Sequence, residues 1–239
     1  VELDKLMELR TYLETEIKPV INDHWDRAEF PKALVKGLAD TKLIGMAWPE
    51  TEPFPTTAVF RGWVALELAR IDASVATYVG VQNGLAMGSL GVCGSDEQRA
   101  YWLPKMHTGE IVGSFGLTEP LSGSDSAQGL RTTATRSGDS YVINGVKQFI
   151  TSGRHGQVAI VIAVTDKAAG KRGMSAFIVP TSAPGYVVAR LEDKLGQHSS
   201  DTAQINFDNC RIPAENLIGE EGEGYKIALS ALEGGRIGI

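Results

Sequence analysis

Cysteine and histidine are scarce in this chain, and their placement excludes several kinds of site. The sequence has two cysteines, Cys93 and Cys210, and neither lies in a C-x-x-C spacing. A disulfide framework or a cysteine-based zinc site is therefore not indicated. The four histidines are scattered without the i, i+4 pairing that is typical of metal ligands, and His198 has only a local hydrogen bond to Asp201 as a candidate contact. We expect no metal site and a reducing, intracellular environment.

Long hydrophobic runs and an excess of positive charge are also absent. The longest apolar run, VAIVIAV at residues 158–164, is far shorter than the roughly 20 residues that span a bilayer. A formal net charge of -6 gives no general attraction to nucleic acids or anionic membranes. We expect a small molecule or another protein as partner, with no nucleic acid and no membrane. The 239 residues, 43% of them hydrophobic, can build one large domain or two small ones.

The first hundred residues carry helical periodicity. Apolar residues recur every three or four positions in the first segment, which predicts an amphipathic helix through Leu3, Leu6, Leu9, Leu13 and Ile17. We expect Pro19 to end this helix. Further helices are predicted from Pro31, over residues 58–70, and after Asp72 to residue 91.

Two local patterns refine the helical half. Ser95 and Gln98 have the spacing of a capping box, which predicts the start of another helix. That helix should end near residue 109. Gly80, Gly84 and Gly88 recur every four residues, a spacing that favours the close approach of a second backbone.

Beyond residue 110 the pattern changes from helical to alternating. Two strand-like runs surround the turn SGD at residues 137–139, and Asn144-Gly145 is a dipeptide typical of a two-residue hairpin. Further strand-like runs follow, separated by Gly, Pro, Asp and Ser: VAIVIAVT, SAFIVP, YVVARL and TAQINFDNCRI. Regular short strands favour a sandwich or a barrel, and the chain turns helical again from residue 222.

These patterns predict an α+β chain in three parts. An all-α helical domain should occupy residues 1–110, and an antiparallel β-barrel or sandwich domain should occupy residues 111–221. Residues 222–239 should begin a further apolar helix, which looks interrupted where the sequence stops.

The stretch GSFGLTEPLSGSD at residues 113–125 joins a buried strand to a polar turn. Its hydroxyls and free backbone amides are of the kind that hold a polar heterocycle or a phosphate. The alternative is an ordinary polar turn, because Ser, Asp, Gly and Pro are the usual turn residues. Taken alone, the stretch favours the ordinary turn.

Four motifs that follow one another along the chain favour the ligand-binding interpretation over the ordinary turn. They are GLTEPLSGSD, YVINGVKQFITSG, KLGQHSSDTAQINFDNCRIPAENLIGEEGEGY and LEGGRIGI. Together they resemble the acyl-CoA dehydrogenase family, and the match extends upstream through ELARIDAS and CGSDEQRAYWLPKMHTGE. Within the family, FGLTEP and the helical segment look most like the glutaryl-CoA dehydrogenase and short-chain acyl-CoA oxidase branch. The resemblance implies a helical N-terminal domain, a β-barrel middle domain and a C-terminal helical bundle, with FAD lying between them. By resemblance, residues 222–239 are the start of the first helix of that bundle, most of which this sequence does not contain.

The first of these motifs implies contacts with the flavin. By resemblance, the segment from Phe115 to Ser124 lines FAD. Leu117 and Thr118 would contact the polar edge of the ring, and Gly123 and Ser124 would lie near the pyrophosphate.

The second motif implies the ring contacts. By resemblance, Phe149 and Ile150 place an aromatic ring against the isoalloxazine, and Thr151 lies near N5, the atom that receives hydride. Many members of the family have Trp where this chain has Phe149. Stacking requires only an aromatic face, so Phe should serve with less contact area.

The substrate site is implied by the last motif together with Ser124. By resemblance, acyl-CoA lies against Ser124, Glu233, Gly234, Gly235 and Arg236, with Arg236 the best candidate for a specific charge role. The family's base is a glutamate, usually in the C-terminal bundle, so we expect it beyond residue 239. A minority of members carry it at the position of Gly235, and glycine cannot accept a proton. We name no catalytic residue in this chain.

The resemblance also limits the substrate and leaves the reaction open. Ala76 stands where glutaryl-CoA dehydrogenases have an arginine for a distal carboxylate, which favours a plain or branched fatty acyl thioester. The implied reaction is FAD-dependent α,β-dehydrogenation of acyl-CoA, with an electron-transferring flavoprotein as acceptor. Two alternatives remain: an acyl-CoA oxidase that uses oxygen, and a non-catalytic module that binds flavin or CoA. The implied parent is a homotetramer of the bacterial cytoplasm or the mitochondrial matrix.

Overall fold

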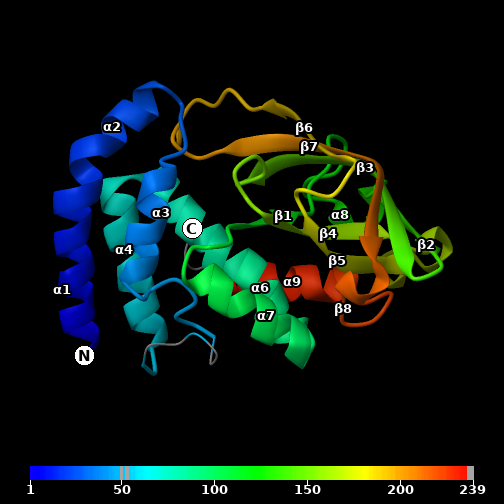
Figure 1. The fold of residues 1–239 in the computed structure, drawn as a ribbon, viewed down its shortest axis with the longest axis horizontal. Helices are drawn as coiled ribbons and strands as arrows, with labels where there is room; N and C mark the ends of the chain where they lie inside the picture. The colour runs from blue at the N-terminus through cyan, green and yellow to red at the C-terminus, as the bar shows by residue number, and fades with distance from the viewer. Residues whose placement is uncertain (49–50, 52–53, 236–239) are drawn as a thin grey trace.

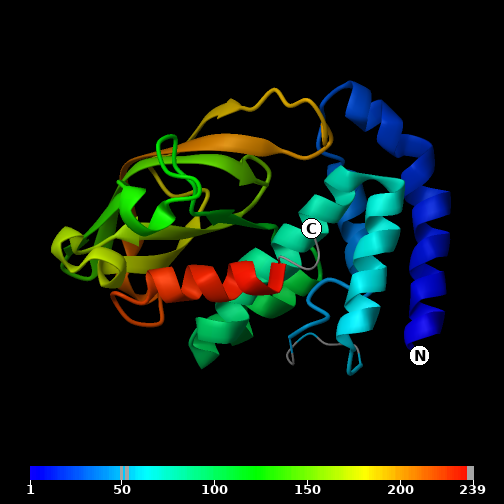
Figure 2. The ribbon, with the colours of Figure 1, turned by 180° about the vertical axis from the view of Figure 1, so that it is seen from behind.

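Helices gather at one end of the molecule and a bent sheet at the other (Figure 1). The computed structural model describes residues 1–48, 51 and 54–235. The helical part runs through α1 (Glu2–Tyr12), α2 (Lys18–Asp26), α3 (Lys32–Asp40), α4 (Ala58–Ile71), α5 (Ala73–Gly80), α6 (Met87–Cys93) and α7 (Asp96–His107). The last helix, α9 (Gly224–Gly235), lies against the sheet and is directed toward the helical end (Figure 2). No helix in these described ranges is long and apolar enough to cross a membrane.

The helices predicted from periodicity and capping are confirmed. Helix α4 spans the predicted segment with one further residue, and α7 begins directly after Ser95. The Ser95 hydroxyl accepts from the amide of Gln98 at 3.1 Å, and the Gln98 side chain accepts from the amide of Ser95 at 3.1 Å. This reciprocal pair is the predicted capping box, and it fixes where α7 starts.

The prediction that Pro19 ends the first helix is wrong. The chain stays helical to the end of α2, because a π-helical segment at Leu13–Ile17 connects α1 to α2 without a break. Pro19 then lies in the first turn of α2, directly after the π-helical segment, and the first turn of an α-helix tolerates proline.

The prediction of a backbone approach at the four-spaced glycines is also wrong. Among the described residues, a Cβ at Gly80 or Gly84 would meet no atom within 4 Å, and one at Gly88 would make only ordinary contact with the Trp48 ring at 3.4 Å. The close approach occurs instead at Gly91, where a Cβ would lie 2.5 Å from the same ring. The group that approaches the helix is thus the indole ring of Trp48 and not a second backbone. It requires a glycine at position 91, one turn after the last glycine of the four-residue pattern.

The sheet confirms the predicted α+β class, although it is not closed. Its strands are β1 (Gly113–Gly116), β2 (Thr133–Ser137), β3 (Ser140–Thr151), β4 (Val158–Val164), β5 (Met174–Pro180), β6 (Tyr186–Leu191), β7 (Thr202–Pro213) and β8 (Leu217–Ile218). Their order is β6-β7-β3-β2-β4-β5-β8, with β1 beside β4. Most neighbours are antiparallel, but β1 and β2 both pair with β4 in parallel. The link from β2 to β4 is the single pair Thr133 and Val164, so the sheet bends sharply there.

Strand β4 is buried on both faces. Val158, Ile160 and Ile162 belong to the core shared with the helices, whereas Ala159 and Val161 belong to a second core enclosed by the bent sheet. A strand covered on both sides needs apolar residues at every position. This explains the uninterrupted run VAIVIAV, and it makes β4 the wall between the two cores.

Asn144-Gly145 does not form the predicted hairpin turn. Both residues lie inside β3, at a shift in its register with β7. The Asn144 side chain accepts from the amide of Asn209 at 2.8 Å, and a Cβ at Gly145 would lie 2.6 Å from the Cα of Thr132. The dipeptide therefore serves a bulge and a close approach, while the true turn joins β2 to β3 through Gly138, with φ 61.

A buried glutamine joins the helices to the sheet. Gln82 lies in the π-helical segment Val81–Ala86 between α5 and α6. Its amide group donates to the carbonyls of Met106 at 3.1 Å and Ile111 at 2.9 Å, and its oxygen accepts from the amide of Gly113 at 2.7 Å. One side chain thus connects the end of α7 to the first residue of β1.

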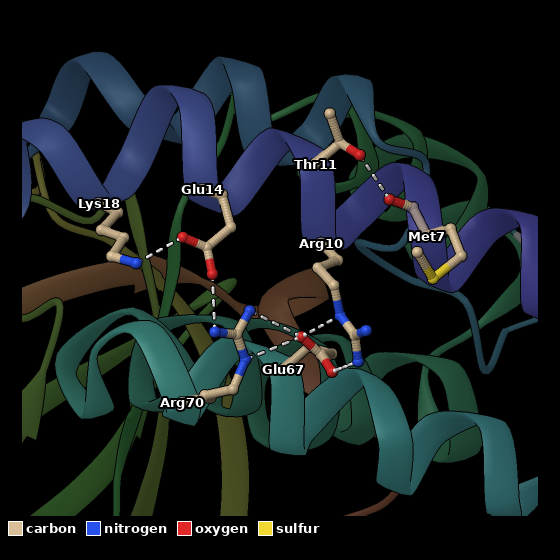
Figure 3. Close-up of polar contacts among 7 residues, drawn as sticks. All are labelled: Met7, Arg10, Thr11, Glu14, Lys18, Glu67 and Arg70. Carbon is tan, nitrogen blue, oxygen red and sulfur yellow. Dashed lines mark hydrogen bonds and ion pairs between the residues drawn. The ribbon is translucent and has the colours of Figure 1, made fainter.

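A buried carboxylate joins α1 to α4 (Figure 3). The Glu67 side chain is 1% exposed and pairs with Arg10 and Arg70. Arg70 also donates to Glu14 at 2.7 Å, and Glu14 accepts from Lys18 at 2.6 Å. The hydrogen bond from Arg10, opposed by burial and supported by Arg70, holds the pKa of Glu67 below its ordinary value of 4.5.

We expect Glu67→Gln to destabilise the fold by about 1–3 kcal/mol near neutral pH, because both guanidinium groups lose their negative partner. A lowered pKa means that the carboxylate's contribution is complete above pH 4.5 and is lost as the pH falls below it. Urea unfolding followed by circular dichroism, from about pH 3 to about pH 7, should therefore show the difference shrinking in acid.

The control for this prediction is Glu8→Gln, which alters a 63% exposed carboxylate paired with Lys5. Its effect should stay below about 0.5 kcal/mol. Equal losses in the two variants would contradict the role assigned to Glu67.

Candidate functional site

The structure brings the two predicted flavin segments side by side. The amide of Gln148 donates to the carbonyl of Thr118 at 2.9 Å, and the Lys147 ammonium donates to the carbonyl of Leu117 at 3.0 Å. These bonds connect the segment after β1 to the last third of β3, directly before Phe149. Although they are about thirty residues apart in the sequence, the two motifs, residues 115–124 and residues 149–151, therefore form one continuous surface. We call this surface the wall.

A buried ion pair lies behind this wall. Lys147 Nζ is 2.8 Å from Glu119 Oε1, and the two side chains are 1% and 5% exposed. The carboxylate also accepts from the amides of Arg131 at 2.7 Å and Thr132 at 3.0 Å. The pKa of Glu119 lies below its ordinary value: burial would raise it, but the Lys147 charge and the hydrogen bonds from Lys147 and Thr132 lower it further. Burial lowers the pKa of Lys147 to about 8, and the nearby Glu119 charge opposes this shift.

Phe149 projects from the sheet because β3 is irregular at this point. The register with β7 shifts between Lys147 and Ile150, and Phe149 has φ 61. The left-handed region is unfavourable for a bulky residue, so the surrounding contacts must hold it there. The result is a Phe149 side chain that is 59% exposed beside an Ile150 that is 2% exposed. An exposed ring on a strand end offers a flat apolar face for stacking.

A compact turn follows Glu119. The amide of Glu119 donates to the carbonyl of Ser122 at 2.9 Å, and the reverse bond is 3.0 Å. The Ser122 hydroxyl donates to the carbonyl of Asp125 at 2.8 Å. Gly123 and Ser124 lie between these anchors and are exposed, and a Cβ at Gly123 would meet no atom of the described residues within 4 Å. The predicted pyrophosphate residues thus lie on the outside of a fixed turn.

Polar groups along the wall are available to a ligand. Within the described part of the chain, the hydroxyls of Thr118, Ser124 and Thr151 accept and donate no hydrogen bond. Phe115 and Leu117, by contrast, are buried, at 8% and 7% exposed. Their side chains belong to the core shared with the helices. Any polar contact from Leu117 to a ligand would come from its main chain.

A second carboxylate orders the turn that follows Thr151. Asp201 Oδ2 accepts from the amides of Arg154 at 3.0 Å and His155 at 2.8 Å, and the Asp201 carbonyl accepts from the amide of Ser152 at 2.9 Å. This fixes the main chain directly after the predicted N5 contact.

The candidate bond between His198 and Asp201 is not formed among the described residues. Asp201 Oδ2 lies 3.2 Å from Nδ1 of His155 instead, and His198 stacks on Trp25 with ring centroids 4.1 Å apart. Burial lowers the pKa of His155, and the nearby Asp201 charge opposes this shift. The loop before β7 is thus attached to α2 by an aromatic contact.

The predicted substrate residues are not brought together with the turn. Glu233 and Gly234 are in the last turn of α9, Glu233 is exposed, and Gly235 is near Leu85. No hydrogen bond or ion pair among the described residues joins them to Ser124. Arg236 lies outside the described residues. In the same described ranges, no three acidic, His or Cys side chains cluster as a metal site would require.

Glu119 and Lys147 were missed by sequence reasoning, and Asp201 was considered only as a partner of His198. A signal for Lys147 exists, because the buried positions Tyr141 and Ile143 alternate along β3 and this alternation continues through Gly145 to Lys147. A lysine at an inward position of a strand requires a buried partner. Glu119 and Asp201 act through main-chain amides far away in sequence, which no local pattern indicates.

Comparison with known families and proteins identifies the class to which this arrangement belongs. Residues 114–210 match the model of the acyl-CoA dehydrogenase middle domain, and residues 5–110 match that of the acyl-CoA dehydrogenase N-terminal domain. The chain belongs to the acyl-CoA dehydrogenase family. The resemblance inferred from the four motifs is thereby confirmed.

Individual relatives agree with this assignment. The chain is 39% identical over 231 residues to the mitochondrial short-chain specific acyl-CoA dehydrogenase of Mus musculus, covering 96% of this chain and 56% of the relative. It superposes with a TM-score of 0.91 on a glutaryl-CoA dehydrogenase from Mycobacterium smegmatis in complex with FADH2, at 35% identity over 99% of this chain and 60% of that one. A solved chain described as electron transferring flavoprotein of Acidaminococcus fermentans gives 0.94 at 34% identity, covering 99% and 62%.

The chain therefore spans about three fifths of the length of these relatives. The confirmed family carries oxidoreductase activity on CH-CH donors, and flavin is implied by the structure with FADH2.

We expect Asp201→Asn to lower the pKa of His155 further, because the variant removes the charge that raises it. The amide oxygen of Asn can still accept the two main-chain bonds, so the turn should keep its shape. The pH titration of the His155 ring protons by NMR measures the change.

Asp166→Asn is the matched control, since Asp166 accepts from the amide of Ala168 in another turn. It should leave the His155 titration unchanged. A rise of the His155 pKa in Asp201→Asn, or no change at all, would be incompatible with the proposed charge contact.

Proposed function

We propose that the whole protein removes two hydrogens from an acyl-CoA thioester, one from the α and one from the β carbon, with FAD as cofactor. One observation carries the proposal: the bonds from Lys147 and Gln148 place the segment at Leu117 and Thr118 against the strand end that presents Phe149. The family's two flavin motifs thus form one surface with an exposed aromatic ring and free hydroxyls.

The residues of this surface fit a flavin. The exposed face of Phe149 suits stacking on a flat heterocycle, and the hydroxyls of Thr118 and Thr151 lie on the two joined segments. The exposed turn at Gly123 and Ser124 suits a phosphate, which is bound by main-chain amides and a hydroxyl. When bound, FAD supplies the acceptor for the β-hydride at its N5 atom.

The remaining site residues have supporting roles. Phe115 and Ile150 are buried and hold the wall in place. For the substrate we propose Ser124 together with Glu233, Gly234, Gly235 and Arg236. The α-proton needs a carboxylate base positioned at the same moment as the hydride acceptor. We propose that this base is a glutamate outside residues 1–239.

We propose a short, uncharged acyl chain as substrate. The mouse relative is named as short-chain specific. Ala76 of α5 is partly buried and packed against the helical core, and its methyl group offers no cation to a distal carboxylate. A dicarboxyl thioester such as glutaryl-CoA should therefore react poorly.

For the electron acceptor we propose an electron-transferring flavoprotein, and for the assembly a homotetramer. The family assignment and the likeness to the Acidaminococcus chain support the first. A bacterial cytoplasm or a mitochondrial matrix is the proposed location, and the second agrees with the naming of the mouse relative as mitochondrial.

The whole protein, supplied with FAD, butyryl-CoA and a dye acceptor, should yield the 2,3-enoyl-CoA, two hydrogens lighter by mass spectrometry. Glutaryl-CoA is the comparison substrate and should react more slowly. A whole protein that holds FAD yet leaves every acyl-CoA unchanged would refute the proposal. Hydrogen peroxide released during turnover in air without a dye would instead identify an acyl-CoA oxidase. Residues 1–239 alone should not bleach the dye, because they lack the proposed base.

The ring of Phe149 should contribute to flavin affinity by stacking. We expect Phe149→Ala to raise the FAD dissociation constant by about tenfold, corresponding to an aromatic contact of about 1.4 kcal/mol. Phe149→Trp should bind at least as tightly as the natural chain. Quenching of flavin fluorescence measures both constants, and equal affinity in all three proteins would exclude stacking on this ring.

A further inference from the structure

We propose that Glu119 and Lys147 are positioning residues for the cofactor. Their buried ion pair sets the turn that carries Ser124, the edge at Thr118 and the ring of Phe149 in one fixed arrangement. This inference rests on the proposed function, since it concerns the surface to which FAD would bind.

Glu119 joins the two ends of the loop that runs from residue 119 to residue 132. Its two carboxylate oxygens accept from the amides of Arg131 at 2.7 Å and Thr132 at 3.0 Å, twelve and thirteen residues further along the chain. The intervening residues include Gly123 and Ser124. Thr132 is fully buried, so its amide has no water to replace the carboxylate. Loss of the carboxylate should release both ends of this loop.

Lys147 attaches the closed loop to β3. Its ammonium donates both to Glu119 and to the carbonyl of Leu117 at 3.0 Å. The next residue, Gln148, donates its amide to Thr118 at 2.9 Å, and Phe149 follows with its left-handed φ of 61. Of three consecutive residues of β3, Lys147 and Gln148 thus hold the loop, and Phe149 carries the exposed ring. A shift of the lysine would move both parts of the wall.

The role of the ion pair is better explained by the main-chain groups that it positions than by a contribution to the free energy of folding. Replacing a buried ion pair with apolar residues of similar volume is often neutral or stabilising. Apolar side chains would fill the same space, but they cannot bind the carbonyl of Leu117 or the amides of Arg131 and Thr132. Because neither charge lies on the exposed surface of the wall, the pair acts through the groups that it holds.

The first test measures FAD affinity in the whole protein for Lys147→Met, Glu119→Gln and the double variant. Glu67→Gln is the matched control, because it also neutralises a buried paired carboxylate, but one between α1 and α4. At a temperature where circular dichroism shows every variant folded, each single variant should weaken FAD binding about tenfold or more, about 1.4 kcal/mol. The double variant should bind FAD as tightly as the single variant that has the lower affinity, since the two groups act as one unit.

Spectra at saturating FAD add a readout that global stability does not move. The fine structure of the flavin's long-wavelength absorption band should change in the two site variants and stay unchanged in Glu67→Gln. Natural affinity and spectrum in Glu119→Gln would overturn the proposal, as would equal weakening in the Glu67→Gln control.

The second test needs no flavin and separates this inference from the proposed function. In the cofactor-free protein, hydrogen exchange of amides in residues 117–119 and 149–151 should accelerate together in Lys147→Met and in Glu119→Gln, but not in Glu67→Gln. Acceleration confined to one segment, or none, would overturn the coupling. If the natural protein binds no FAD, the proposed function fails, while this exchange experiment still decides whether the pair joins the two segments.

Discussion

The buried ion pair between Glu119 and Lys147 is the interaction on which the candidate site depends. Two charges removed from water are stabilising only when the geometry is good and the remaining hydrogen-bonding groups are satisfied. Here the carboxylate has two main-chain donors besides the ammonium, and the ammonium has a carbonyl besides the carboxylate. The pair can therefore stay ionised in the interior and hold three distant segments of chain together.

The rest of the fold gives this pair a rigid setting. Strand β4 separates two cores and contributes alternate side chains to each. The buried Gln82 attaches the helical part to β1 through three main-chain groups. The segment that leaves β1 and enters the candidate site is thereby fixed at its origin. Irregular backbone, such as the left-handed Phe149, persists only where such a frame over-determines it.

Local sequence patterns predicted most of the elements but not their interruptions. Helical and alternating periodicity, and the capping box at Ser95, arise from contacts within one element, so the sequence displays them directly. Pro19 and Asn144-Gly145 were misread because a π-helical turn and a β-bulge accommodate residues that usually end an element. Whether such an accommodation forms depends on partners such as β7 that are remote in sequence.

The candidate site shows the same division. The segments at residues 115–124 and 149–151 were predicted through resemblance to a family, and the structure shows that they are joined by hydrogen bonds. The groups that join them were not predicted, although the inward alternation of β3 pointed to Lys147. The arrangement of Glu233 and Gly235 relative to Ser124 could not be derived, because no contact within the described residues connects them.

A crystal structure of the whole protein with FAD bound would test the central claim most directly. The account predicts an isoalloxazine ring stacked on Phe149, with the hydroxyls of Thr118 and Thr151 in contact with it and the Glu119–Lys147 pair intact behind them. Flavin bound on another surface, or bound here with the pair broken and the two segments apart, would contradict it.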